Sequence, residues 1–141
     1  MTMISFRCTA TTRDVEPGTE QADASGLHVR GRVFTDVVES SDARFAGENR
    51  VAVELDIDPK ANKSELRGKF TLRPKVGDGA WEGEMLGEIV DGLVVAHGIG
   101  RGTGSLAPAV IRIDFKQLKS HPGASPVAEP KAFFEMTGWT L

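Results

Sequence analysis

The chain has 141 residues, of which 40% are hydrophobic and 26% are charged, and its formal net charge is -3. We expect one soluble domain over residues 1–141, and the slightly acidic balance gives no electrostatic reason to expect a nucleic-acid partner. No apolar run approaches the length that spans a membrane, and the first residues do not have the pattern of a signal peptide. The single cysteine excludes an intramolecular disulfide, so we expect a cytoplasmic protein.

Alternation of apolar and polar residues recurs along the chain and predicts β-strands. In chain order, eight segments have this pattern: residues 4–11, 27–33, 51–57, 65–72, 81–89, 93–99, 111–116 and 132–141. No segment carries a convincing run of apolar residues at helical spacing. One apolar face per strand indicates a sheet between a core and water, and eight such strands can close into a barrel without exposed edges. We therefore predict an all-β fold, an eight-stranded antiparallel up-and-down β-barrel of calycin-like type, with a β-sandwich as the alternative.

The inward face is clearest where the alternating partners are charged, because a one-residue slip in register would bury those charges. The residues predicted to point into the core on this ground are Val51, Val53, Leu55, Leu66, Phe70, Leu72, Ile111, Ile113 and Phe115.

Two of the expected connections are long, namely residues 14–25 and residues 119–131. In an up-and-down barrel, odd-numbered connections share one rim, so both would flank the same mouth. Long loops in compact domains serve either as lids over a binding site or as plain flexible connections. We expect any small-molecule ligand to enter at this rim.

Glycine recurs with a period of two between residues 79 and 104. Glycine inside a strand is costly, so this pattern predicts either sharp bends of the sheet or a face kept free of side chains. Trp81 and Met85 share a strand face with two of these glycines, an arrangement that fits either an apolar pocket or a core tryptophan at a barrel bend. Trp81, Met85, Phe115 and Trp139 are the candidate substrate-binding residues.

His97 and Glu135 are the candidate catalytic residues. His97 lies in phase with the aliphatic residues of the segment 93–99, and it points inward if that face, rather than the glycine face, lines the core. Glu135 lies in phase with Phe133 and Trp139, although the opposite phase is also apolar. A histidine or a carboxylate on an apolar face is either paired within the core or able to move a proton near neutral pH.

Cofactor and metal motifs are missing from the sequence. The glycines between residues 98 and 104 are not followed by a helix, so they do not form a dinucleotide fingerprint, and there is no phosphate-binding loop. The three histidines have no spacing typical of a zinc or iron site. We expect neither a cofactor nor a metal.

Three short motifs resemble those of known β-barrels. Residues 41–47 (SDARFAG) resemble the S-D-P-R-x-x-G turn of small bacterial β-barrel proteins of unassigned function, and residues 79–83 (GAWEG) resemble their G-T-W-E-G strand. Residues 102–106 (GTGSL) resemble the G-x-G-x-(F/L) turn shared with allene oxide cyclase-like and dirigent-like barrels, whereas Pro108 departs from the glycine-rich continuation of those barrels. The resemblance implies a barrel, together with cofactor-free cyclisation or radical-coupling control of apolar substrates in its lumen.

Three functions follow as hypotheses. The first is a cofactor-independent isomerase or cyclase acting on an apolar, polyketide-like or fatty-acid-like substrate in the lumen, with His97 or Glu135 handling a proton. The second is a non-catalytic binder of an apolar small molecule, and the third is a structural or interaction barrel with a filled core. A homo-oligomer is an open alternative to a monomer under all three. The first requires an internal cavity with an inward polar group, the second a cavity without one, and the third predicts none.

Overall fold

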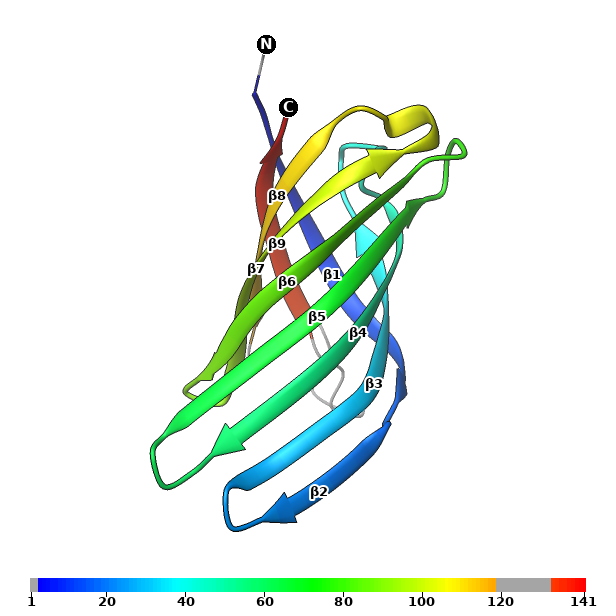
Figure 1. The fold of residues 1–141 in the computed structure, drawn as a ribbon. Coiled ribbons are helices and arrows are strands. Elements are labelled where there is room, and N and C mark those ends of the chain that lie inside the picture. The colour runs from blue at the N-terminus through cyan, green and yellow to red at the C-terminus, as the bar shows by residue number, and fades with distance from the viewer. Residues whose placement is uncertain (1–2, 119–132) are drawn as a thin grey trace, which may run out of the picture.

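Nine antiparallel strands make up nearly all of the computed structural model, which describes residues 3–118 and 133–141 (Figure 1). The strands are β1 (Ile4–Glu16), β2 (Thr19–Asp23), β3 (Gly26–Glu39), β4 (Gly47–Asp58), β5 (Lys63–Pro74), β6 (Ala80–Val90), β7 (Leu93–Thr103), β8 (Val110–Leu118) and β9 (Phe133–Thr140). One short 3-10 helix, η1 (Gly104–Leu106), lies between β7 and β8. The expected connection 119–131, with its suggested role as a lid, lies outside the described residues.

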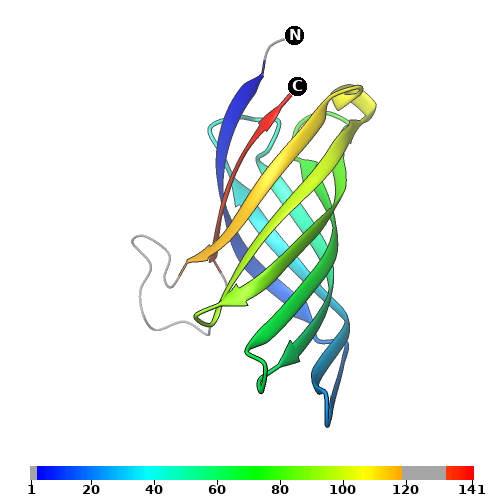
Figure 2. The same cartoon turned by 60° about the vertical axis from the view of Figure 1, so that its left-hand side comes forward.

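The sheet closes on itself as a barrel. Its strand order is β1-β9-β8-β7-β6-β5-β4-β3-β2, and β1 also pairs with β3, from Thr9 opposite Glu39 to Glu16 opposite Val33. Eight strands therefore form a closed antiparallel up-and-down barrel with β2 as an extra strand, which confirms the predicted fold over the alternative sandwich. Ile4 pairs with Thr140, so the two ends of the chain lie together at one end of the barrel (Figure 2).

The expected long loop at residues 14–25 is wrong, because most of these residues are in strands. β1 continues to Glu16, and after a short turn β2 pairs with the first half of β3, from Thr19 opposite Arg30 to Asp23 opposite Gly26. The β2–β3 hairpin extends the wall at the end of the barrel opposite the termini (Figure 1). Every residue of β2 is exposed, so the strand has no apolar face, and alternation in the sequence could not reveal it.

Phe70 decides which face of β7 points inward. The inward residues of β7 are small, and a Cβ added at Gly100 would lie 3.0 Å from Phe70 Cζ. On the neighbouring strand, a Cβ added at Gly83 would lie 2.6 Å from the same atom. The glycines are therefore inside, where the absence of side chains makes room for the Phe70 ring. Phe115 packs edge-on against this ring at a centroid distance of 5.9 Å.

An aromatic stack fills the end of the barrel near the termini. The rings of Phe6 and Phe45 stack with centroids 3.9 Å apart, and the rings of Phe45 and Trp81 stack at 5.3 Å. Phe45 belongs to the SDARFAG segment, where Arg44 Nη2 donates to Asp42 Oδ2 at 2.6 Å. Trp81 Nε1 donates to the Arg44 carbonyl oxygen at 2.9 Å, so this turn is tied to the core.

The predicted core residues do point inward. All of them are buried except Leu55, which is half-buried and packs against the core. An eight-stranded barrel has an interior just wide enough for side chains. Here that interior holds Phe70, the aromatic stack, and the aliphatic residues of β4, β5 and β8.

Candidate functional site

Three of the predicted binding residues lie on the inner face of the barrel. Trp81, Met85 and Phe115 are buried within one core cluster. Met85 packs over Gly68, where an added Cβ would lie 2.9 Å from Met85 Cγ. Trp81 stacks on Phe45 and Phe115 packs against Phe70, so all three side chains belong to the packed core.

His97 is on the outside, because of the two faces left open for this strand it is the glycine face that lines the core. It is exposed on β7 and pairs in register with Leu86 of β6 and Asp114 of β8. Val95 and Ile99, which are in phase with it, are exposed as well, and Ile99 keeps 68% of its surface. The reason is the Phe70 ring, which only the glycine face of β7 can accommodate.

Glu135 and Trp139 also lie on the outer face, because the inward phase of β9 carries Phe134 and Met136. Glu135 Oε1 is 3.9 Å from Arg7 Nη2 of the neighbouring β1, and its side chain is 38% exposed. Trp139 pairs in register with Arg112 of β8. The structure therefore does not bring His97, Glu135 or Trp139 together with the inward residues Trp81, Met85 and Phe115.

The barrel interior contains a polar group that the sequence analysis missed. Thr12 Oγ1 donates to Asp36 Oδ1 at 2.8 Å, and the side chain of Asn49, the register partner of Asp36, has no hydrogen-bond partner among the described residues. Asp36 is 5% exposed and Asn49 1% exposed. Burial raises the pKa of the Asp36 carboxyl to about 6, with the Thr12 hydrogen bond opposing this shift. The signal in the sequence was a polar residue in phase with Phe34 and Val38, in a segment where no strand was predicted.

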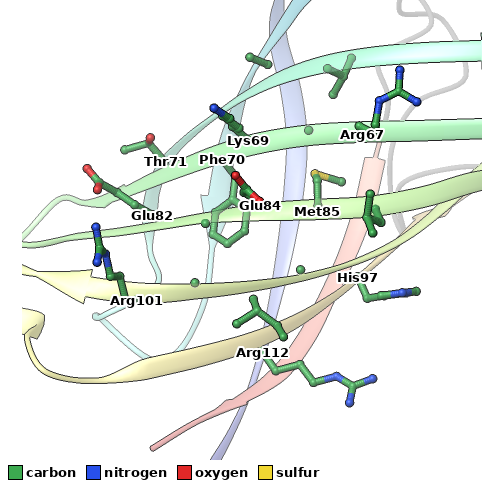
Figure 3. Close-up of a pocket in the computed structure, with 18 of the residues that line it drawn as sticks. Arg67, Lys69, Phe70, Thr71, Glu82, Glu84, Met85, His97, Arg101 and Arg112 are labelled. Atoms are coloured by element: carbon green, nitrogen blue, oxygen red, sulfur yellow. The ribbon is translucent and has the colours of Figure 1, made fainter.

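An open pocket of about 1550 Å³ lies over the outer face of β4 to β8 (Figure 3). Glycines of three neighbouring strands (Gly68, Gly83, Gly98 and Gly100) thin the wall beneath it. Leu86 and Ile99 stand exposed among charged side chains, and Leu86 keeps 58% of its surface. The charged residues that Figure 3 labels around them are Arg67, Lys69, Glu82, Glu84, Arg101 and Arg112.

Charges on this outer face follow the strand register. Glu84 of β6, Ile99 of β7 and Arg112 of β8 lie side by side in one row across the wall. A second row has the same order of acid, aliphatic and base. It consists of Glu88, Val95 and Lys116. In these two rows the acid is on β6 and the base on β8, whereas the other outward rows carry Leu86, His97 and Asp114, and Glu82, Arg101 and Val110.

Metal ligands are not grouped in the described part of the chain, where no three histidine, cysteine, aspartate or glutamate side chains could hold an ion together. No helix over the same residues is long and apolar enough to cross a membrane. In comparisons with known proteins, no family model matches the chain, and no curated protein or solved structure is significantly similar to it.

Proposed function

We propose that this chain is an interaction β-barrel with a filled core, which associates with a second copy of itself through the outer face of β6 to β8. The observation that carries this proposal is the exposed Ile99, which lies between Glu84 of β6 and Arg112 of β8 in the strand register. Large aliphatic side chains grouped on an exposed sheet face are typical of interaction surfaces.

Self-association is supported by the arrangement of charge. A two-fold axis along β7 would place Ile99 against Ile99 of the second copy and Glu84 opposite Arg112 of the second copy. The same operation would place Glu88 opposite Lys116 of the second copy. A two-fold interface uses the same patch twice, so it requires this kind of self-complementarity. Arg112 Nη2 lies 4.0 Å from Asp114 Oδ1, at the outer limit of an ion pair, and is able to take a closer carboxylate.

A small molecule fits this outer surface less well than a protein does. Small-molecule sites are concave and enclose most of their ligand. The pocket on the outer wall is instead wide and open to solvent, and charged residues of both signs line it. Such a surface gives specificity through complementary charges across a large interface.

Replacing Ile99 with glutamate is expected to abolish self-association, because it places two carboxylates on the two-fold axis. Sedimentation equilibrium at low salt checks this. We expect a concentration-dependent mass for the wild-type protein and a monomer for Ile99→Glu. The control is Val76→Glu, since Val76 is 73% exposed but lies in the turn after β5, away from the patch.

Charge reversal tests the proposed geometry. Glu84→Arg and Arg112→Glu should each weaken the dimer, and the double variant should restore it. A wild-type protein that remains monomeric up to about 1 mM, equivalent to ~4 kcal/mol of association free energy, would refute the proposal. So would a double variant no stronger than either single one.

A second candidate function is proton-transfer catalysis in the interior, and Asp36 favours it. The cofactor-independent isomerase or cyclase predicted from the sequence needs an inward group that titrates near neutral pH, and Asp36 supplies one. Titration of polyketide-like and fatty-acid-like compounds with detection of tryptophan fluorescence tests both this candidate and simple lumen binding. Saturable quenching that Asp36→Asn changes would support catalysis, and unchanged fluorescence would exclude both.

Two further expectations also stay proposals. The turn motifs support a relationship to allene oxide cyclase-like barrels, and the single cysteine supports a cytoplasmic location.

A further inference from the structure

A second pocket, of about 320 Å³, lies at the end of the barrel where the β2–β3 turn meets the β4–β5 turn. Three of its lining residues form a chain of hydrogen bonds. Ser25 Oγ is 2.8 Å from His28 Nε2, and His28 Nδ1 is 2.7 Å from Asp56 Oδ1. Ser25 belongs to the hairpin turn, His28 to β3 and Asp56 to β4, where His28 and Asp56 are register partners. Glu88 lines this pocket and also belongs to the outer patch around Ile99, whereas Ser25, His28 and Asp56 lie outside that patch.

We propose that Ser25, His28 and Asp56 are the nucleophile, general base and orienting carboxylate of a site that hydrolyses carboxylic esters with short acyl chains. The order of atoms is the one that a serine nucleophile needs, with its hydroxyl on one imidazole nitrogen and a carboxylate on the other.

The reaction balances with these groups and water. Ser25 Oγ attacks the ester carbonyl carbon while His28 Nε2 takes the hydroxyl proton. The bond from carbon to the leaving oxygen then breaks, and His28 returns the proton to the departing alcohol. Water next attacks the acyl carbon and gives a proton to His28. The bond to Ser25 Oγ breaks, the carboxylic acid leaves, and Ser25 regains its proton.

Asp56 is held in place and kept ionised. Its Oδ1 accepts from Arg30 Nη2 at 2.9 Å as well as from His28, and its Oδ2 accepts from Arg67 Nη2 at 3.0 Å. These hydrogen bonds, the one from His28 first, hold the pKa of Asp56 far below its usual range. A carboxylate that accepts from Nδ1 leaves the lone pair of the neutral imidazole on Nε2, which faces Ser25.

The pocket also offers features that an ester requires. Ile57 and Ile89 supply apolar surface for a short acyl chain. Asn62 and Lys63 line the same pocket and carry donors suited to the charge that develops on the carbonyl oxygen.

Asp23 contributes, after Asp56, to the pH at which the site works. Its Oδ1 lies 2.5 Å from Ser25 Oγ and 3.1 Å from His28 Nε2, so Asp23 competes with His28 Nε2 for the one proton of the Ser25 hydroxyl. Hydrogen bonds to Asp56 and then to Asp23 raise the pKa of His28 above its usual value of 6.5. The other charged residues around the pocket and its carboxylate are Arg30, Asp58, Lys63, Glu65, Arg67 and Glu88. Since only the neutral imidazole takes a proton, ester hydrolysis should rise with pH as His28 titrates.

Reaction with a fluorophosphonate probe, together with hydrolysis of p-nitrophenyl acetate, tests the assignment. We expect mass spectrometry to locate the phosphonate on Ser25, and Ser25→Ala to lose labelling and at least tenfold of the hydrolysis. The matched control is Ser105→Ala at the opposite end of the barrel, where Ser105 hydrogen-bonds Asp78 as Ser25 does Asp23, but where the pair is not joined to a histidine. This variant should behave as wild type.

Asp23→Asn tests the catalytic role through the pH dependence of hydrolysis, which would not change if the cluster were purely structural. Removing this carboxylate should lower the pKa of His28 and shift the pH midpoint of hydrolysis downward. The proposal is overturned if the wild-type protein is not labelled, if Ser25→Ala is labelled and hydrolyses as wild type does, or if the pH midpoint is the same in Asp23→Asn.

Discussion

Replacing Phe70 with alanine is expected to lower the free energy of unfolding by about 3–5 kcal/mol. The ring is 2% exposed and occupies the space over the glycines of β6 and β7. Those glycines have no side chains that could move into the vacated volume, so the cavity should persist and the cost should lie at the upper end of this range. Chemical denaturation with unchanged m-value is the measurement.

The control for this prediction is Val76→Ala in the turn after β5. Val76 is a large apolar residue that is 73% exposed and lies away from the proposed interface, and exposed substitutions usually change stability by no more than about 0.5 kcal/mol. A loss below about 1 kcal/mol for Phe70→Ala would mean that the ring lies beside an existing void, and the filled-core reading of the barrel would then fail.

Replacing Asp36 with asparagine is expected to stabilise the protein above pH 7 by an amount on the order of 3 kcal/mol at most. Burial raises the pKa of Asp36 from 3.8 to about 6, a difference of roughly 2 units at 1.36 kcal/mol each. Between these values the unfolded chain binds fewer protons than the folded one. With respect to this group, the wild-type protein therefore has its full free energy of unfolding below pH 4 and loses stability as pH rises through 6.

The difference between wild type and Asp36→Asn isolates this group, because other carboxylates act in the opposite direction. Asp42, for example, has its pKa lowered by its hydrogen bonds from Arg44, so its contribution is lost in acid. The two proteins should have similar stabilities near pH 4 and should diverge by pH 8. The exposed Asp114→Asn serves as the control. A difference independent of pH would show that Asp36 has an ordinary pKa in the folded state.

The sequence by itself determined the inward face of the strands whose two faces differ in chemistry. In β4, β5 and β8, aliphatic or aromatic residues alternate with charged ones, so only one register keeps the charges in water. The inward direction of Val51, Phe70 and Ile113 therefore followed from local pattern. Closure into a barrel followed as well, because eight strands with one apolar face each otherwise leave exposed edges.

Tertiary structure determined which face points inward in the strands whose two faces are chemically alike. Both faces of β9 carry apolar residues, and the two faces of β7 carry glycines and aliphatic residues. The residue pattern therefore did not favour one orientation of either strand over the other. The Phe70 ring, which comes from a strand not adjacent to β7, set the direction there and placed His97 outside. Asp36 and Asn49 meet only through strand pairing, and Ser25, His28 and Asp56 meet only where two turns converge. Such groupings depend on the pairing register between segments that are distant in the sequence. Alternation within one strand does not reveal which residues of a neighbouring strand will lie opposite it.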